Sequence, residues 1–419
     1  MDILHRDALF DIASGATVLA SGGGGSIQTA YSFIQQILEV KHPVQLVDLD
    51  DLNDDDRGAV VAAMGSPESF EKIGLNGAET RALSVLQDRL ELPLTFVVSV
   101  ETGSNLFVAM LAAISNLRGP LKVLNADGAN RSVPTLSLLT FSESVAATPL
   151  VILNAADGPF KGGRYPGALT LDLTPETTPV EQAQIAEMTL RPLLSSVGTF
   201  DGIAAIAGWV MSGRAAQRSL ISNTVTQSQV IGSMLRQIGP DCADPLGAFC
   251  EEYTQTFGQA LTPLFGNTRP CQLADQVSES KGGFDFTVLT FVQRAEDGTE
   301  RTIVVLNQNE NLIAWDTRCS HPLAMAPDLL CMMGRLKASV INKIVQPLSP
   351  QDQEAARAVL TGFHGLSVED VVEEQDLFLF TLPAAPELTT GPELARFNAI
   401  LQSLGYFGPN LSTQCQQGD

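Results

Sequence analysis

Residues 94–117 read Leu-Thr-Phe-Val-Val-Ser-Val-Glu-Thr-Gly-Ser-Asn-Leu-Phe-Val-Ala-Met-Leu-Ala-Ala-Ile-Ser-Asn-Leu. The stretch begins with a short apolar run, Leu94–Val100, which is typical of a strand buried on both faces. A polar corner, Glu101–Asn105, closes that run, and Leu106–Leu117 is then predicted to be a helix. Together they predict a strand–turn–helix unit, from which a sheet covered by helices is built.

The same alternation extends to both sides of this stretch. An apolar run at Ala59–Met64 precedes a segment with helical spacing at Ala78–Leu90, and a third apolar run lies at Leu121–Leu124. Short apolar strands that alternate with helices indicate a mostly parallel sheet with helices on both faces. We therefore predict an α/β fold for the N-terminal part of the chain.

Polar residues follow each of these three runs, at Gly65-Ser66, Glu101–Asn105 and Asp127–Arg131. Each cluster by itself has an ordinary explanation as a turn or a helix cap. In open parallel sheets, however, ligands bind beyond the carboxyl ends of the strands. Because all three clusters follow such an end, we expect them to converge on one site.

A run of four glycines, Ser21-Gly22-Gly23-Gly24-Gly25-Ser26, lies between two predicted helices, Asp7–Ala20 and Ser26–Val40. Glycine has no Cβ, so the run can adopt positive φ and let a ligand touch the backbone. Ser26 is a suitable N-cap, and the bare N–H groups of a helix start bind anions or a developing oxyanion. Gly23, Gly24, Gly25 and Ser26 are therefore candidate anion-binding residues. The alternative is a flexible connector.

A glycine- and proline-rich stretch at Asp157–Gly167 predicts a domain boundary. The N-terminal α/β domain then comprises residues 1–163, and the C-terminal domain comprises residues 164–419. Within the second domain, residues 164–266 have an α/β pattern and residues 267–385 are β-rich. A C-terminal helix and a tail follow.

The composition limits the classes of partner. The 419-residue chain has a formal net charge of −22, which argues against nucleic acid or an anionic membrane surface. No apolar run is long enough to span a bilayer, and no secretion signal is visible. The six cysteines form no C-x-x-C pair and fit reduced thiols. We expect a cytoplasmic homo-oligomer that binds a small-molecule substrate.

Short motifs recur in a characteristic order along the chain. The first half contains Gly22–Gly25, Glu101-Thr102-Gly103, Ala126-Asp127-Gly128-x-x-Arg131-x-x-Pro134 and Ala147-Thr148-Pro149-Leu150. The second half contains Ser212-Gly213, Ile221-x-x-Thr224, Ile231-Gly232, Gly282-Gly283-Phe284, Gln308-Asn309-Glu310-Asn311-Leu312 and Ala326-Pro327-Asp328-Leu329. In this order, over roughly residues 5–330 and again near Leu377–Pro386, the chain resembles the S-methyl thiohydantoin desulfurase-like family.

The resemblance implies hydrolytic attack on a hydantoin-like or imidazolone ring, in which water removes a sulfur substituent from a five-membered thiohydantoin. The chain departs from the family pattern in two places. The family usually follows its glycines with Asp-Pro, whereas Ser26-Ile27 stand here, and Met332–Glu374 does not align. Both departures leave the actual substrate open.

Displacement of a thiolate by water requires a base or a metal that activates the water, and donors that stabilise the tetrahedral adduct. Glu101 and Asp127 are the candidates for base and acid, or for carboxylate ligands of a divalent metal. Neither is assigned a particular role. The backbone of Gly23–Ser26 is the candidate donor to the developing anion.

Substrate contacts are expected from Asn105, Asn130 and Arg131, which follow the predicted strands. Their amides suit ring N–H and C=O groups, and an arginine fork suits a propionate tail. The cofactor stays open, because Cys319-Ser320-His321 is the one tight Cys/His pair and no second pair has zinc spacing.

Two other functions remain open. The glycine run by itself is compatible with a phosphate- or nucleotide-binding module. However, it lacks the P-loop Lys-Ser/Thr and the dinucleotide spacing, and it follows a predicted helix rather than a strand. The missing Asp-Pro is compatible with a catalytically diverged binding protein of the same family.

Overall fold

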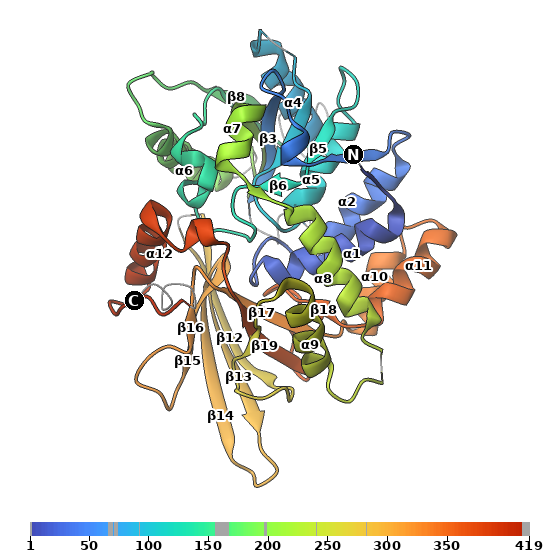
Figure 1. Cartoon of the computed structure of the whole chain (residues 1–419), viewed down its shortest axis with the longest axis vertical. Coiled ribbons are helices and arrows are strands. Elements are labelled where there is room, and N and C mark those ends of the chain that lie inside the picture. Colours follow the sequence, from blue (N-terminus) through green and yellow to red (C-terminus); the bar gives the residue numbers. More distant parts are fainter. Residues whose placement is uncertain are drawn as a thin grey trace.

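An eight-stranded sheet forms the upper part of the molecule in Figure 1. The computed structural model describes residues 2–65, 70, 74–91, 93–155, 167–196, 199–239, 241–281 and 283–412. The strand order is β1 (Asp2–Leu4), β2 (Val44–Val47), β5 (Lys122–Leu124), β4 (Phe96–Ser99), β3 (Arg57–Gly65), β9 (Ile203–Ser212), β7 (Leu150–Asn154) and β8 (Ala168–Leu171).

Strands β2, β5, β4 and β3 pair in parallel. The other pairings in this sheet, β1–β2, β3–β9, β9–β7 and β7–β8, are antiparallel. The predicted α/β class is therefore confirmed, and the predicted parallel arrangement holds for four strands of a mixed sheet.

Helices cover both faces of the sheet, as expected. Val61 and Val97 contribute to one core cluster, together with residues of α1 (Arg6–Leu19), α2 (Ile27–Glu39), α4 (Ala78–Arg89) and α5 (Asn105–Ile114). Their chain neighbours Val60 and Val98 point into a second cluster, with residues of α6 (Pro179–Leu194) and α7 (Gly213–Ser219). Because successive side chains of a strand point to opposite faces, burial on both sides explains the continuous apolar runs.

The strands on either side of the predicted boundary at 163/164 belong to one sheet. Strand β9, which follows that boundary in the chain, lies between β3 and β7. The boundary itself lies in residues 156–166, outside the described residues, and the division into two domains stays a prediction.

The predicted β-rich part contains two further sheets. One is antiparallel and five-stranded, with β12 (Gln272–Lys281), β13 (Phe284–Arg294), β14 (Glu300–Gln308), β15 (Glu310–Asp316) and β16 (Ala324–Met325). The other has the order β11 (Thr262–Pro263), β19 (Leu377–Leu382), β17 (Leu329–Gly334) and β18 (His364–Gly365). In Figure 1 both lie below the first sheet.

The segment that did not align, Met332–Glu374, contains α10 (Ala338–Val345) and α11 (Pro350–Leu360). These helices follow β17 and interrupt the β-rich part of the chain. The predicted C-terminal helix is α12 (Gly391–Ser403), and the tail from residue 413 lies outside the described residues.

Helices α1 and α8 (Thr224–Gln237) lie side by side at the centre of the molecule (Figure 1). A Cβ at Gly15 would lie 1.8 Å from the carbonyl oxygen of Ser228, and one at Gly232 would lie 1.8 Å from that of Asp11. Only glycine permits so close an approach. Helix α9 (Pro245–Phe257) also packs against α8, and residues of α1, α8 and α9 share one core cluster.

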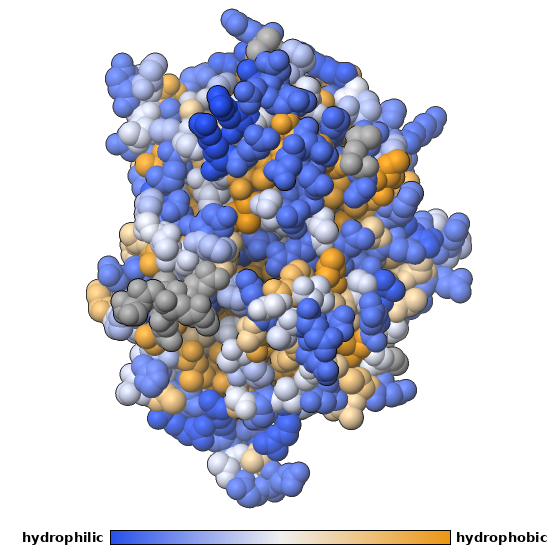
Figure 2. Space-filling model, viewed as in Figure 1, coloured by the Kyte–Doolittle hydropathy of each residue, from blue (hydrophilic) through white to orange (hydrophobic). Residues whose placement is uncertain are grey.

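The surface seen in Figure 2 is mostly hydrophilic, with hydrophobic residues exposed in small groups. No helix in the described part of the chain combines the length and the apolar sequence needed to cross a membrane. The expected homo-oligomer stays a prediction.

Candidate active site

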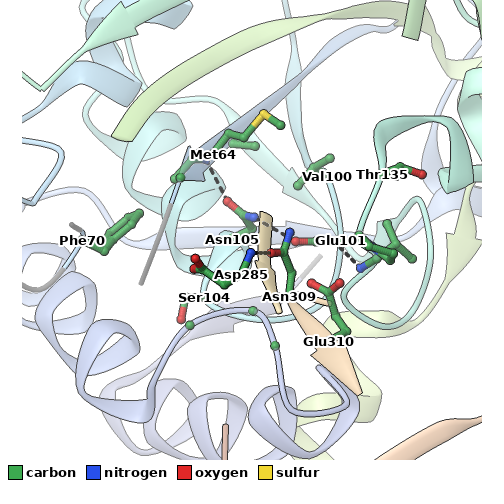
Figure 3. A pocket seen from close by; sticks show the side chains of 18 of the residues that line it. Met64, Phe70, Val100, Glu101, Ser104, Asn105, Thr135, Asp285, Asn309 and Glu310 are labelled. Atoms are coloured by element: carbon green, nitrogen blue, oxygen red, sulfur yellow. Dashed lines mark hydrogen bonds between the residues drawn. The ribbon is translucent and has the colours of Figure 1, made fainter. Parts of the chain in front are cut away.

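A cavity of about 140 Å³ lies where the carboxyl ends of β3 and β4 meet the glycine run and strands β13–β15 (Figure 3). A cavity of about 150 Å³ in another protein holds benzene, so the space suits one small ring. The polar and charged side chains among its described lining residues are Thr29, Glu101, Ser104, Asn105, Thr135, Glu187, Arg191, Asp285, Thr287, Asn307, Asn309, Glu310 and Glu369.

The glycine run forms one wall of the cavity through Gly23, Gly24 and Gly25. Gly24 and Gly25 have φ of +68° and +83°, which favour glycine. A Cβ at Gly23 would lie 2.6 Å from Cγ of Glu310. The run is also held in place, because Ser104 N–H donates to the Gly24 carbonyl at 3.0 Å. This packing contradicts the alternative of a flexible connector.

Ser26 has a different position from the one expected. Its hydroxyl accepts a hydrogen bond from the Thr29 N–H at 3.2 Å and caps α2, which confirms the predicted N-cap. The described lining of the cavity does not include Ser26, so its expected place among the anion-binding residues is corrected. The sequence could not separate the two roles, because both use the same helix start.

The departure at Ser26-Ile27 has a structural counterpart in the segment that did not align. Asp370 Oδ2 accepts a hydrogen bond from the Ile27 N–H at 3.2 Å. A proline at this position would have no N–H to donate. One hydrogen bond at the start of α2 thus connects Ile27, where the chain departs from the family pattern, to the segment that did not align.

Glu101 lies at the cavity wall with both carboxyl oxygens held. Oε2 accepts the N–H of Val133 at 2.8 Å, and Oε1 accepts the side-chain amide of Asn105 at 3.2 Å. The Asn105 oxygen in turn accepts the N–H of Ala63 at 2.8 Å. Burial raises the pKa of Glu101 to about 7 against the opposing effect of these two donors. Such a carboxyl exchanges protons at neutral pH, as a general base or acid must.

Glu310 is a second cavity carboxyl, which the sequence analysis did not single out. It is 4% exposed, and its Oε2 has no hydrogen-bond partner within the described parts of the chain. Burial raises its pKa well above the usual value, and the neighbouring Glu101 acts in the same direction. Glu310 belongs to a motif that carried the family resemblance, but a lone glutamate in a β-rich region has no spacing that indicates chemistry.

Asp127 does not line the cavity, contrary to expectation. It is fully buried, and its oxygens accept hydrogen bonds from the Thr102 hydroxyl at 2.6 Å and from the N–H groups of Ala129 and Asn130 at 2.9 and 2.6 Å. It thereby joins the corner after β4 to the loop after β6 (Ala126–Asp127). The two loops converge as expected, but the carboxyl of Asp127 binds groups of these loops instead of facing the cavity.

Asn130 and Arg131 also lie outside the described cavity lining, so their expected place there is corrected. The Asn130 amide donates to Gln227 at 2.9 Å. Arg131 is fully buried and donates to the carbonyls of Pro327 and of Asp328, the latter at 3.1 Å. Its guanidinium therefore connects the loop after β6 to the turn between β16 and β17.

Glu187 and Arg191 of α6 are further cavity residues that the sequence did not reveal. Arg191 Nη2 lies 2.7 Å from Glu187 Oε1, and both side chains are 11% exposed. Arg191 also donates to the carbonyls of Gly283 and Pro134 at 2.6 and 2.8 Å. The pair thus connects α6 to the start of β13 and to the loop after Arg131. A helical i, i+4 ion pair is too common in sequences to indicate a site.

The described residues contain no group of three His, Cys, Asp or Glu side chains that could hold a metal ion. Cys319 and His321 are absent from the described lining of the cavity. The expectation of a divalent metal therefore gains no support from the described residues.

The two halves of the chain match two family models. Residues 7–158 match the N-terminal domain described as S-Me-THD-like, and residues 181–395 match the C-terminal domain of the same description. No curated protein matches the chain. The crystal structure of a protein from Chromobacterium violaceum is similar, with 26% sequence identity, a TM-score of 0.75 and coverage of 99% of this chain and 100% of that one. Since the two family models together span most of its length, this chain belongs to the S-Me-THD-like family.

Proposed function

We propose that this protein is a hydrolase that removes a sulfur substituent from an S-alkylated thiohydantoin-type ring. One observation carries the proposal: two buried carboxyl groups, Glu101 and Glu310, face one cavity of about 140 Å³. Carboxyl groups whose environments give them different proton affinities serve as base and acid. Family membership supports a thiohydantoin-related substrate.

In the proposed reaction, the oxygen of water bonds to the ring carbon that carries sulfur, and Glu101 takes a proton from that water. The electron pair of the C=N bond moves to the ring nitrogen, which takes a proton from Glu310. The C–S bond then breaks, and the departing sulfur takes the proton held by Glu101. The adduct's hydroxyl returns its proton to Glu310 as C=O forms. The products are a hydantoin-type ring and a thiol, and both carboxyl groups are restored.

The developing oxyanion requires donors. The N–H groups of Gly24 and Gly25 are the candidates, since both glycines line the cavity and neither N–H donates to a backbone carbonyl among the described residues. Asn105 has another part in this proposal. Its amide is already bonded to Glu101 and Ala63, so it positions the base instead of binding the ring.

The test is thiol release from an S-methyl thiohydantoin, followed with a thiol-reactive dye. Wild-type protein is expected to release thiol in proportion to ring consumed. Glu101→Gln should lower the rate by about 100-fold or more, the usual contribution of a general base. Glu354→Gln, the same change at an exposed carboxyl of α11, is the matched control and should have wild-type activity.

Absence of thiol release by the wild-type protein would overturn the proposal. So would full activity of Glu101→Gln. Thermal stabilisation by nucleotides but by no hydantoin or thiohydantoin would favour the phosphate-binding alternative instead.

A further inference from the structure

Strand β12 forms one edge of the five-stranded sheet. It pairs with β13 along its length, and no other strand of the described chain pairs with it. All of its residues except Leu273 are exposed. Figure 1 shows this sheet extending below the rest of the molecule. An edge of this kind presents unpaired N–H and C=O groups to which another strand can bind.

Most features that protect natural edge strands from pairing are absent from β12. Such strands are commonly very short, or they carry a proline or a bulge. Strand β12 has ten residues and no proline, and its shift of register relative to β13 lies between Leu273 and Asp275, near its first residue. The stretch Asp275–Lys281 is therefore a regular and exposed edge.

One face of this edge combines charged and apolar side chains. Because side chains alternate along a strand, the same face carries Asp275, Val277, Glu279 and Lys281. Val277 lies opposite Val288 of β13, and these two side chains are 59% and 40% exposed. Two exposed valines that are neighbours across a sheet form an apolar contact surface, unlike single apolar residues scattered over a protein.

The charges of β12 are complementary to a second copy of the same strand. Around a two-fold axis, a contact made by one copy is repeated by the other. If two antiparallel β12 strands meet with the axis at Ser278, Asp275 of each copy lies opposite Lys281 of the other. With the axis at Val277, Asp275 would lie opposite Glu279, and with the axis at Glu279, the two copies of Glu279 would meet. Opposite charges stabilise a cross-strand pair and like charges destabilise it, so the pattern favours the register centred on Ser278.

We propose that two copies of this chain associate through antiparallel β12 strands centred on Ser278, so that their five-stranded sheets form one continuous sheet. Asp275 and Lys281 pair at both ends of the contact. Val277 packs between Val288 of its own copy and the aliphatic part of Glu279 of the second copy. The inference goes beyond the proposed function and does not depend on it.

Charge exchange tests the pairing, with sedimentation velocity of the full-length protein as the measurement. We expect a dimer of the wild-type protein. Asp275→Lys and Lys281→Asp each place like charges opposite each other at both ends of the contact, and each should weaken dimerisation by about tenfold or more. The double variant restores opposite charges and should dimerise within about threefold of the wild type.

The matched control is Glu354→Lys, which makes the same kind of charge reversal as Asp275→Lys at an exposed position of α11. It should leave dimerisation unchanged. Dimerisation that both single variants retain in full would overturn the inference. So would a double variant that dimerises as weakly as the single ones, or a wild-type protein that is monomeric at every concentration.

Cysteine cross-linking tests the register separately. Directly opposite residues of antiparallel strands have Cα atoms about 4.5–5.5 Å apart, a separation that a disulfide can bridge. Ser278→Cys should therefore form a covalent dimer under mild oxidation, and Glu354→Cys should not exceed the wild type. More efficient cross-linking by Val277→Cys than by Ser278→Cys would overturn the proposed register. Both measurements use oligomeric state alone, so they are independent of thiol release.

Discussion

Two features of its surroundings shift the pKa of the Glu101 carboxyl in opposite directions. Burial favours its neutral form, and hydrogen bonds from Val133 and Asn105 favour its ionised form. Burial has the larger effect, so the pKa is raised to about 7. Asp127 is buried as well, but the Thr102 hydroxyl and the N–H groups of Ala129 and Asn130 donate to its oxygens. A buried carboxyl group thus faces the cavity at position 101, whereas at position 127 it holds the backbone of two loops together.

The pH dependence of stability follows from the raised pKa of Glu101. In the unfolded chain this carboxyl ionises near its ordinary pKa of 4.5, and in the folded protein near about 7. Between these two pH values the folded protein keeps this carboxyl protonated, whereas the unfolded chain has lost the proton. The free energy of unfolding should therefore fall as pH rises from about 4.5 to about 7. The loss is on the order of 3 kcal/mol at most.

Urea denaturation midpoints at the two ends of this pH range measure the effect. Glu101→Gln should remove part of the decline, since glutamine does not titrate, and Glu354→Gln should not. An identical decline in the wild type and in Glu101→Gln would show that Glu101 has an ordinary pKa in the folded protein.

At the scale of elements, the glycine run acts as a contact surface between segments that are distant in sequence. Ser104, in the corner after β4, donates to Gly24, and Val368 of the segment after β18 donates to Gly22 at 2.9 Å. A Cβ at Gly22 would lie 2.3 Å from the side chain of Asn311. The absence of side chains in the run thus lets α1, β4 and β15 approach one another.

Gly23→Ala tests this role. The added methyl would lie 2.6 Å from Cγ of Glu310 and 2.7 Å from the carbonyl oxygen of Asn309. Since the second atom is backbone, the loop must move, and we expect a loss of about 1–3 kcal/mol, as for overpacked cores. Thiol release should fall as well, because the shift displaces Glu310.

The matched control is Gly239→Ala, where no atom lies within 4 Å of the added Cβ. It should change stability by less than about 0.5 kcal/mol. Chemical denaturation of both variants gives the comparison. A Gly23→Ala protein as stable and active as its control would show that the run can move aside without consequence.

At the scale of the whole molecule, the site is assembled from both matched parts of the chain. Glu101 and the glycine run lie in residues 7–158, and Glu310 and Arg191 lie in residues 181–395. The sheet is shared in the same way, because β9 lies between β3 and β7. Neither the cavity nor the sheet is complete in one half.

Residues 1–158 expressed alone should therefore fail to form a stable domain. Without β9, strands β3 and β7 would each present an unpaired edge, which promotes aggregation. We expect the fragment to aggregate in size-exclusion chromatography and to have weak near-ultraviolet circular dichroism, whereas the full chain should elute as one species and unfold cooperatively. A soluble fragment with a cooperative unfolding transition would contradict this expectation.

The local units could be predicted from the amino-acid sequence: apolar runs buried on both faces, polar corners where strands end, the N-cap at Ser26, and the convergence of the corner at Glu101 with the loop after β6. These follow from side-chain periodicity and backbone chemistry, which act over a few residues. Which polar groups reach the cavity depends on how distant segments pack together, and local sequence patterns do not show that. The tertiary structure placed Glu310 and Arg191 there from distant elements, and it turned Asp127 and Arg131 toward carbonyl and N–H groups. The direction of a side chain at the end of a strand depends on the segments that pack against it, and those segments come from distant parts of the sequence.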